Sequence, residues 1–177
     1  RPRTRAIIPT RWNPQPRARA LAREAEAHLK GRGVDVDFID LQELGPLPLA
    51  GSEGSWDGEA VAGLEARLSA AQGILFAAPV YTYDLNAAAK NVAELAGGGF
   101  EDKPVGFLLA AGGFGSYMSV MSFANSLMLD FRSFILPRFV YALNDAVVGG
   151  QVTDAKVRTR IHELADEMLR VSVALAR

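Results

Sequence analysis

Cysteine is absent from this chain of 177 residues, which excludes disulfides, thiolate nucleophiles and zinc–thiolate sites. A reducing cytoplasm is therefore the simplest expected location. Histidine is scarce: His28 and His162 lie on separate predicted helices without carboxylate partners at ligand spacing, so no metal site is expected. The net charge is only −1, so no overall field favours nucleic acid or an anionic membrane, and neither partner is expected.

Long apolar runs and familiar catalytic motifs are also missing. No run approaches the roughly 20 apolar residues that a membrane helix needs. The first predicted strand is followed by no G-x-G-x-x-G, and the chain has no G-x-S-x-G elbow and no G-x-x-x-x-G-K-[ST] loop. Lys90, in AAAKN, is interpreted as a helix-face lysine rather than a Schiff-base nucleophile. We therefore assign no catalytic residue.

What the chain does contain is a regular alternation of apolar runs and segments of helical period. The predicted strands are residues 4–8, 34–39, 73–78, 105–110 and 134–142, and the predicted helices are residues 17–30, 58–71, 86–96, 117–131 and 154–176. Runs such as GILFAA and VGFLLAA are apolar without alternation, which is typical of strands covered on both faces. The pattern predicts one α/β domain over residues 1–177: a three-layer, doubly wound parallel sheet of five strands, flavodoxin-like in its order 2-1-3-4-5.

The loop after the first strand, PTRWNPQPR, is the expected place for a phosphate. In such a sheet the ligand lies beyond the carboxyl ends of the strands, and a helix amino terminus there offers free N–H groups and partial positive charge. Thr10 supplies a hydroxyl. Asn13 and Gln15 supply amides, and Arg11 and Arg17 supply charge. The alternative is that the arginines are solvated surface charges.

The loop after the third strand, APVYTYDLN, carries two aromatic rings. Pro79 is expected to end the strand, and Asp84 is expected to cap the next helix. Tyr81 and Tyr83 offer flat apolar walls with polar tips, which suit a planar ligand. Packing of the tyrosines against a neighbouring helix or subunit is the open alternative.

The loop after the fourth strand, AAGGFGSY, is rich in glycine. Gly112 and Gly113 lack a β-carbon, so the backbone there can approach a ligand edge closely or adopt a positive φ. Ser116 is expected to cap the following helix. A plain tight turn is the alternative, and the proximity to the two-tyrosine loop favours a ligand site.

At these loops the sequence resembles the NADPH-dependent FMN reductase family, the flavodoxin-like group that includes quinone, chromate and azo-dye reductases. AAPVYTYDLNAAAKN (77–91) is similar to the family's segment after strand three, with Ala89 in place of the usual leucine. DKPVGFLLAAGGFG (102–115) is similar to its K-P-V strand and Gly-Gly turn. The first loop departs from the family, because prolines and Ala18 replace most of the phosphate-binding hydroxyls.

The resemblance implies an oxidoreductase that passes electrons from NADH or NADPH through bound FMN to a quinone, free flavin or similar small acceptor. It implies that the FMN phosphate faces residues 10–17. It also implies that the flavin ring lies against two loops, whose residues are Pro79, Val80, Tyr81, Thr82, Tyr83, Gly112, Gly113 and Phe114. A flavin-free binding or assembly module with a degenerate phosphate loop is the alternative.

Self-association is expected from the predicted helices 86–96 and 117–131. The first is rich in alanine, which permits close helix approach. The second carries more apolar residues than one core-facing stripe needs: Met118, Met121, Phe123, Leu127, Met128 and Phe131. We therefore predict a homodimer or a homotetramer, with these helices paired and the flavin site near the seam.

Overall fold

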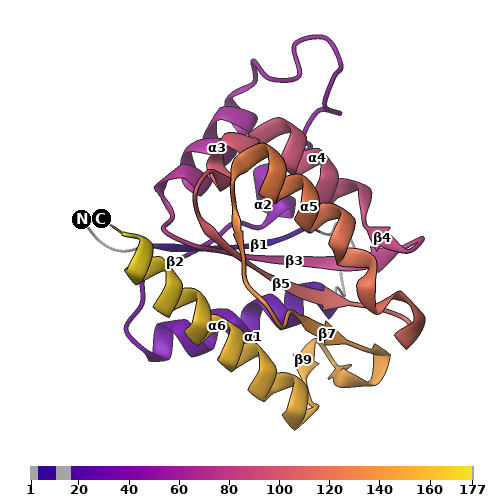
Figure 1. The fold of residues 1–177 in the computed structure, drawn as a ribbon. Coiled ribbons are helices and arrows are strands. Elements are labelled where there is room, and N and C mark those ends of the chain that lie inside the picture. Colours follow the sequence, from indigo (N-terminus) through magenta and orange to yellow (C-terminus); the bar gives the residue numbers. More distant parts are fainter. Residues whose placement is uncertain (1–3, 11–16, 177) are drawn as a thin grey trace.

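The computed structural model describes residues 4–10 and 17–176, and its centre is a mainly parallel sheet (Figure 1). Its strands are β1 (Arg5–Pro9), β2 (Val36–Phe38), β3 (Ile74–Tyr81), β5 (Pro104–Ala110), β6 (Phe134–Ile135) and β7 (Val140–Ala142). The order is β2-β1-β3-β5, and β6 and β7 both pair with β5 at the edge. The predicted order is confirmed, since β6 and β7 together occupy the fifth position.

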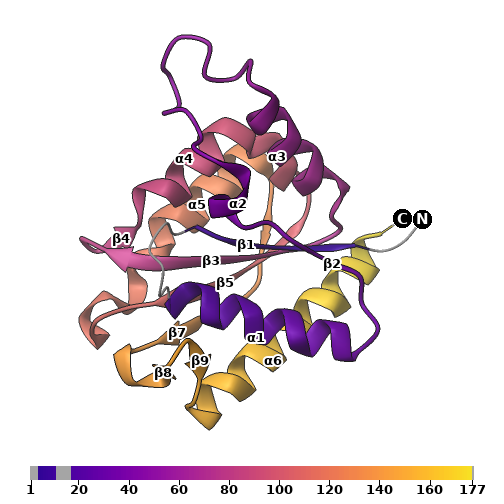
Figure 2. The ribbon, with the colours of Figure 1, turned by 180° about the vertical axis from the view of Figure 1, so that it is seen from behind.

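Helices cover both faces of the sheet, as the apolar strands predict (Figures 1 and 2). One face carries α1 (Arg17–Gly31) and α6 (Ala155–Leu175); the other carries α2 (Leu41–Leu44), α3 (Glu59–Ala70), α4 (Ala87–Ala96) and α5 (Val120–Phe131). Each face has its own core. Phe76 and Phe107 of the strands meet Phe123 of α5 on one side, and Leu75 and Leu108 meet α1 and α6 on the other. The three-layer prediction is confirmed.

The fifth strand is interrupted where one continuous strand, 134–142, is predicted. The break follows Leu136, whose N–H still donates to the carbonyl of Val105 at 2.9 Å. Pro137 has no N–H to donate, and Arg138 has a positive φ of 60°, so neither residue continues the ladder. Pairing resumes at β7, opposite Leu108. The edge strand is therefore interrupted at Pro137 and Arg138, and we call this interruption the notch.

The helix ends differ from the predicted caps. Asp154 caps α6, accepting from the N–H groups of Lys156 and Val157. Asp84 does not cap α4 but lies in the short strand β4 (Asp84–Leu85), which pairs antiparallel with β3. Ser116 does not cap α5: it lies within a 3₁₀ turn, Phe114–Ser119, that replaces the first turn of the predicted helix. Both capping predictions were wrong because each loop continues further in non-α geometry.

The remaining elements are short: 3₁₀ turns Gly97–Phe100 and Asn144–Ala146, and a hairpin of β8 (Val147–Val148) and β9 (Gln151–Val152). A surface loop, residues 45–58, follows the unpredicted α2. In the ranges that the structure describes, no helix has the length and apolar character to cross a membrane.

Lys103 fastens the start of β5 to the ends of two helices. Its Nζ donates to the carbonyls of Leu68 (2.6 Å), Ser69 (2.9 Å) and Gly99 (2.9 Å). Burial lowers the pKa of Lys103 to about 8, although the three carbonyl acceptors favour the ammonium form. The contacts make this half-buried lysine a structural residue rather than a reactive one.

We expect Lys103→Met to lower the free energy of unfolding by about 1–3 kcal/mol, because the helix-end carbonyls lose their donor. Urea denaturation measures this, and Lys90→Met is the control, since the exposed ammonium of Lys90 is paired with Glu94 on its own helix rather than with helix-end carbonyls. The lowered pKa means that the folded chain binds fewer protons than the unfolded chain between pH 8 and 10.5. The stability of the parent relative to Lys103→Met should therefore rise through that window, and a constant difference would contradict the burial of the ammonium.

Candidate functional site

The carboxyl ends of β1, β3 and β5 lie side by side, at the right of Figure 1. This is the edge at which doubly wound sheets bind ligands. Three loops meet there, beginning at Thr10, after Tyr81 and after Ala110. Of the predicted phosphate-loop residues, Arg11, Asn13 and Gln15 lie outside the described residues.

The loop after β3 is a tight hairpin rather than an open strand-to-helix turn. β3 continues through Pro79 to Tyr81, so the prediction that Pro79 ends the strand was wrong. Tyr81 pairs with Asp84, so Thr82 and Tyr83 alone form the turn. Both adopt left-handed backbone conformations, with φ of 52° and 57°. Such turns favour Asn and Gly, and a β-branched threonine there is strained. Strain of this kind concentrates at ligand sites, and here it presents two tyrosine rings at the sheet edge.

Both tyrosines are exposed, Tyr81 by 46% and Tyr83 by 75%. The hairpin is nevertheless held in place, because the Asp84 carboxylate accepts from Ser122 Oγ of α5 at 2.9 Å and from the N–H of Leu85 at 2.7 Å. Tyr83 reaches across to the next loop, since its hydroxyl lies 3.6 Å from where a β-carbon on Gly115 would stand. The hairpin thus presents exposed aromatic surface on a fixed support.

The loop after β5 exposes backbone donors. The N–H of Ala111 is taken by the carbonyl of Ala142 at 2.9 Å, but no acceptor in the described part of the chain reaches the N–H of Gly112 or Gly113. A β-carbon added at either glycine would meet nothing within 4 Å, and neither has a positive φ. The glycines were predicted either to let a ligand approach closely or to adopt a positive φ. The open space agrees with the first prediction, and the second is wrong.

Tyr141, which sequence reasoning missed, holds this loop from the edge strand. Its hydroxyl donates to the carbonyl of Gly113 and lies 2.6 Å from Ser116 Oγ. Phe114 follows Gly113 and is 77% exposed. The loop therefore combines an anchored carbonyl with free N–H groups and an exposed ring.

Thr10 contacts its own fold rather than a ligand, which corrects its predicted role as a phosphate donor. The side chain is fully buried, and its hydroxyl lies 3.2 Å from the carbonyl of Ala77 and 3.1 Å from Asn86 Oδ1. Asn86 Nδ2 donates to the carbonyl of Thr10 in return. Asn86, a second residue that sequence reasoning missed, thus joins the β1 loop to the β3 loop.

Arg17 links the end of the loop after β1 to the loop after β5. It opens α1, and its Nη1 donates to the carbonyl of Ala111 at 2.9 Å. One guanidinium has five N–H donors, so this contact leaves others for an anion. The position at a helix amino terminus adds the helix dipole to its charge. Arg17 is therefore the described residue best placed to contact a phosphate.

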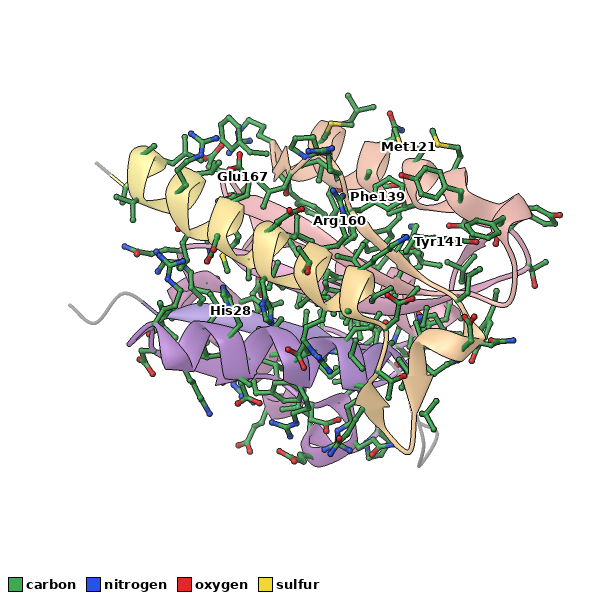
Figure 3. All side chains as sticks on the ribbon, turned by 90° about the horizontal axis from the view of Figure 1, so that it is seen from below. His28, Met121, Phe139, Tyr141, Arg160 and Glu167 are labelled. Atoms are coloured by element: carbon green, nitrogen blue, oxygen red, sulfur yellow. The ribbon has the colours of Figure 1, made fainter. Side chains whose placement is uncertain are left out.

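The two histidines lie on separate helices, as predicted, but their rings stack between α1 and α6 with centroids 4.1 Å apart, and each has a carboxylate partner that was not predicted. His28 Nε2 lies 2.9 Å from Asp166, and His162 Nε2 lies 2.8 Å from Glu24. Among the described residues, no group of three or more His, Cys, Asp or Glu side chains is arranged to hold a metal ion. His28 lies between α1 and α6 (Figure 3), and the stacked pair belongs to these two helices rather than to the loops after β3 and β5.

The family is identified by a sequence match that includes all three loops. The family model for NADPH-dependent FMN reductase matches residues 7–148, which include all three loops. The chain belongs to the NADPH-dependent FMN reductase family. Membership makes it an NAD(P)H-dependent flavin oxidoreductase with FMN as cofactor and a small-molecule acceptor, and a flavin-free module is not favoured.

Solved structures agree on the fold. An oxidoreductase from Corynebacterium diphtheriae has a TM-score of 0.78 at 20% identity, covering 97% of each chain. The flavoenzyme NAD(P)H:(acceptor) oxidoreductase FerB from Paracoccus denitrificans has a TM-score of 0.76 at 19% identity, covering 97% of this chain and 98% of that one. An NADH:FMN oxidoreductase in its apo form reaches 0.78 at 13% identity, covering 98% and 90%. No curated protein sequence matches this chain.

The described residues fit the flavin that the family requires. A flavin ring needs flat apolar walls and hydrogen-bond donors at its polar edge. The exposed rings of Tyr81 and Tyr83 offer the walls, and the free N–H groups of Gly112 and Gly113 offer the donors. The described residues therefore fit both the flat faces and the polar edge of the flavin ring.

Proposed function

We propose that residues 1–177 form one catalytic unit in which FMN binds across the three loops and reduces a quinone, a flavin or an azo dye at the expense of NADH or NADPH. The observation that carries this assignment is that the N–H groups of Gly112 and Gly113 meet no acceptor among the described residues and lie beside exposed aromatic rings at the carboxyl edge of the sheet. We also propose a cytoplasmic location, where reduced nicotinamide nucleotides are made.

Each part of the site has a distinct role in this proposal. Bound FMN supplies the hydride chemistry, accepting from the nicotinamide and donating to the acceptor. Gly112 and Gly113 donate N–H groups that stabilise negative charge at the polar edge of the ring. The ring lies against Pro79 and Val80 at the end of β3, with the hairpin residues Thr82 and Tyr83 beyond. Arg17 contacts the phosphate from the amino terminus of α1, and Arg11, Asn13 and Gln15, which were also predicted to face it, lie outside the described residues.

The test of this function is purification without added cofactor, followed by an absorption spectrum and titration with FMN and riboflavin. Bound oxidised flavin gives a band near ~450 nm. The loaded protein is expected to oxidise NADH or NADPH when menadione or an azo dye is added. A protein that binds neither flavin, or binds FMN without any turnover, would contradict the proposal.

The tyrosine hairpin provides a sharper prediction. Tyr83→Ala and Tyr81→Ala are each expected to weaken FMN binding or slow turnover by up to about tenfold, because an aromatic contact is worth about 0.5–1.5 kcal/mol beyond burial. Tyr83→Gly should lose the same binding yet preserve or raise thermal stability, because glycine accepts the φ of 57° without strain. Flavin fluorescence titration and thermal melting measure the two effects.

Phe134→Ala is the matched control for these variants, since this half-exposed ring lies at the opposite end of β5, across from Pro104. It should leave FMN binding unchanged. If the tyrosine variants bind FMN like the parent but change oligomeric state, the tyrosines belong to an interface instead.

We further propose that the protein is a homodimer or homotetramer. Two of the residues expected at the interface were wrong: Phe123 and Leu127 are buried in their own core, facing the sheet. The alanines of α4 also turn mainly inward. The outward apolar surface of the 3₁₀ turn and α5 is instead carried by Met118, Met121, Met128 and Leu129, which are 42–77% exposed.

Exposed apolar surface of this kind favours association of a second copy. We expect sedimentation at micromolar concentration to give a dimer or tetramer, and the double variant Met118→Glu/Met121→Glu to give monomers because it buries two charges in the contact. A parent protein that sediments as a monomer would contradict this prediction.

A further inference from the structure

The notch in the edge strand opens a second pocket beside the flavin site. A cavity of about 400 Å³ lies between the edge strand, the 3₁₀ turn Phe114–Ser119 and the first turns of α6. Its lining has two parts. Tyr117, Phe139 and Tyr141 form an aromatic wall, with Val140 and Val157 at its base, and the charged residues are Arg138, Lys156 and Arg160.

The aromatic wall is a packed cluster with a free face. The ring centroid of Tyr117 lies 5.0 Å from that of Phe139 and 5.3 Å from that of Tyr141, the second pair being edge-to-face. Tyr117 is 44% exposed, and Phe139 and Tyr141 are partly buried against the core. Figure 3 shows Phe139 and Tyr141 along the edge strand, with Arg160 of α6 beside them. A planar ring therefore has a surface to stack on.

The charges in this pocket all have one sign. Among the described residues that line it, none is a carboxylate. In the described part of the chain, the side chains of Arg138 and Lys156 make no ion pair or hydrogen bond, whereas most other cations of α1 and α6 do. Arg160 is partly engaged, donating from Nη2 to the carbonyl of Arg138 at 2.9 Å and from Nη1 to Glu163 at 3.4 Å. The pocket thus offers two uncompensated cations to an anion.

Comparison with the neighbouring cavity and with the amino terminus of α6 indicates which groups would attract an anion to this pocket. The neighbouring cavity shares Arg138 and Arg160 but is lined by Glu163 and Glu167, so its charges compensate one another. The amino terminus of α6 is already capped by Asp154, so attraction of an anion rests on the side-chain cations rather than on free helix N–H groups. Binding in the cationic pocket would therefore depend on named side chains that can be changed one by one.

The pocket is physically connected to the flavin loop. Tyr141 lines the pocket with its ring and holds the carbonyl of Gly113 with its hydroxyl. The 3₁₀ turn that carries Tyr117 begins at Phe114 in the same loop. The pocket and the loop after β5 therefore share Tyr141 and the 3₁₀ turn.

We propose that this pocket binds the anionic end of a reactant of the flavin reaction: an aromatic or heteroaromatic ring that carries a phosphate or sulfonate group. The inference rests on the proposed function. Two sources have this chemistry, the phosphorylated adenosine end of the electron donor and an acidic aromatic acceptor. The ring stacks on Tyr117 and Phe139, and the anion contacts Arg138 and Lys156.

Protection of the sheet edge is the competing account. Cations and a proline on a short edge strand prevent pairing with another sheet, and Arg138, Lys156 and Pro137 fit that role as well. On that account, removing the charges promotes aggregation and leaves ligand binding unchanged. The two accounts therefore differ in a measurable way.

The test is isothermal titration calorimetry on the FMN-loaded protein and on the protein without flavin. The probes are adenosine 2′-phosphate compared with adenosine, and a naphthoquinone sulfonate compared with menadione. The variant is Arg138→Gln/Lys156→Gln. Its control is Arg132→Gln/Lys90→Gln. Arg132 has a left-handed backbone with a φ of 52°, close to the 60° of Arg138, and Lys90, like Lys156, is an exposed lysine on a helix.

We expect at least one anionic probe to bind more tightly than its neutral partner, and the pocket variant to weaken that binding about tenfold or more while the control does not. Loss of adenosine 2′-phosphate binding, with a raised KM for NADPH and an unchanged KM for NADH, identifies the donor. Loss confined to the sulfonate identifies the acceptor. FMN affinity should be the same in parent, variant and control.

Equal binding of charged and neutral probes would overturn the proposal, as would a pocket variant that binds both anions like the control. Aggregation of that variant with unchanged anion binding would assign the cations to edge protection. Because calorimetry on the flavin-free protein needs no turnover, failure of the proposed flavin reaction would be seen separately, as absence of FMN binding or of nicotinamide oxidation.

Discussion

Arg17→Ala is expected to weaken FMN binding about ten- to a hundredfold, because a charge-assisted contact is worth about 1.5–3 kcal/mol. Arg17 begins α1, so its guanidinium and the helix dipole act at the same point. Riboflavin, which lacks the phosphate, should lose much less. Fluorescence titration with both flavins measures the difference.

Arg17 could act on the FMN phosphate directly or on the flavin ring through its contact with Ala111, and the comparison with riboflavin separates these two effects. The carbonyl of Ala111 lies directly before Gly112, whose N–H is assigned to the ring, so loss of the Arg17 donor also disturbs the ring side. Arg17→Lys keeps the charge but loses the planar fork, and should fall between parent and alanine variant. Arg23→Ala, on the same helix and paired with Glu26, is the control.

Equal losses for FMN and riboflavin in Arg17→Ala would mean that Arg17 acts only by positioning Ala111. Equal affinities of the two flavins for the parent protein would mean that the loop does not recognise phosphate at all. Either result would remove Arg17 from the phosphate site while leaving the ring-side assignment intact.

The strand order was predictable because buried parallel strands leave a strong local signature. Segments such as ILFAA and VGFLLA are apolar at every position, and both lie in the middle of the sheet with helices on each face. The last helix was equally clear, since Ile161, Leu164 and Met168 recur on one face and are buried. These features depend on residues close together in the chain.

The contacts that organise the site join residues far apart, and no local pattern reveals them. Thr10 meets Asn86, Arg17 meets Ala111, and Tyr141 meets Gly113 only once the sheet has formed. The β3–β4 hairpin was missed for a different reason. Its turn residues, Thr82 and Tyr83, are unfavourable in the left-handed conformation, so the sequence lacks the Asn-Gly signal of such a turn.

The width of the buried side of α5 is also not given by the sequence. Its polar residues Ser122, Ser126 and Asp130 mark the outward side, but Met121 and Met128 lie at the border between the polar and the apolar side, so the pattern does not show whether they are buried. The structure turns Phe123 and Leu127 toward Phe76 and Phe107 and leaves Met121 and Met128 outside. Two of the residues predicted at the interface, Phe123 and Leu127, are therefore buried in the core, and the interface itself stays a prediction.

Asn86→Ala is expected to lower the free energy of unfolding by about 1–3 kcal/mol and to weaken FMN binding as well. The side chain is buried and makes two bonds to Thr10, accepting from its hydroxyl at 3.1 Å and donating to its carbonyl. The N–H of Asn86 donates to the carbonyl of Pro79 at 3.2 Å, so the same residue fixes the end of β3. Its loss leaves buried polar groups unsatisfied and frees both loops.

A double-mutant cycle with Thr10→Val separates the pair from other effects of the substitution. If the two side chains act through each other, the double variant is less damaged than the sum of the singles, with a coupling of about 0.5–3 kcal/mol. Asn91→Ala is the matched control. Asn91 makes the same two kinds of bond, to the carbonyl of Pro48 at 2.9 Å and from the N–H of Ala50 at 2.8 Å.

Asn91 fastens the surface loop around Pro48, which lies away from the three ligand loops, so its loss should cost stability but leave FMN affinity unchanged. Urea denaturation and flavin titration on the same samples compare the two asparagines. Should Asn86→Ala lose stability yet bind FMN like Asn91→Ala, the link between the β1 and β3 loops would be structural only. A loss of FMN affinity restricted to Asn86 would instead mean that a buried hydrogen-bonded pair, with no atom free for the ligand, sets the distance between the phosphate side and the ring side of the site.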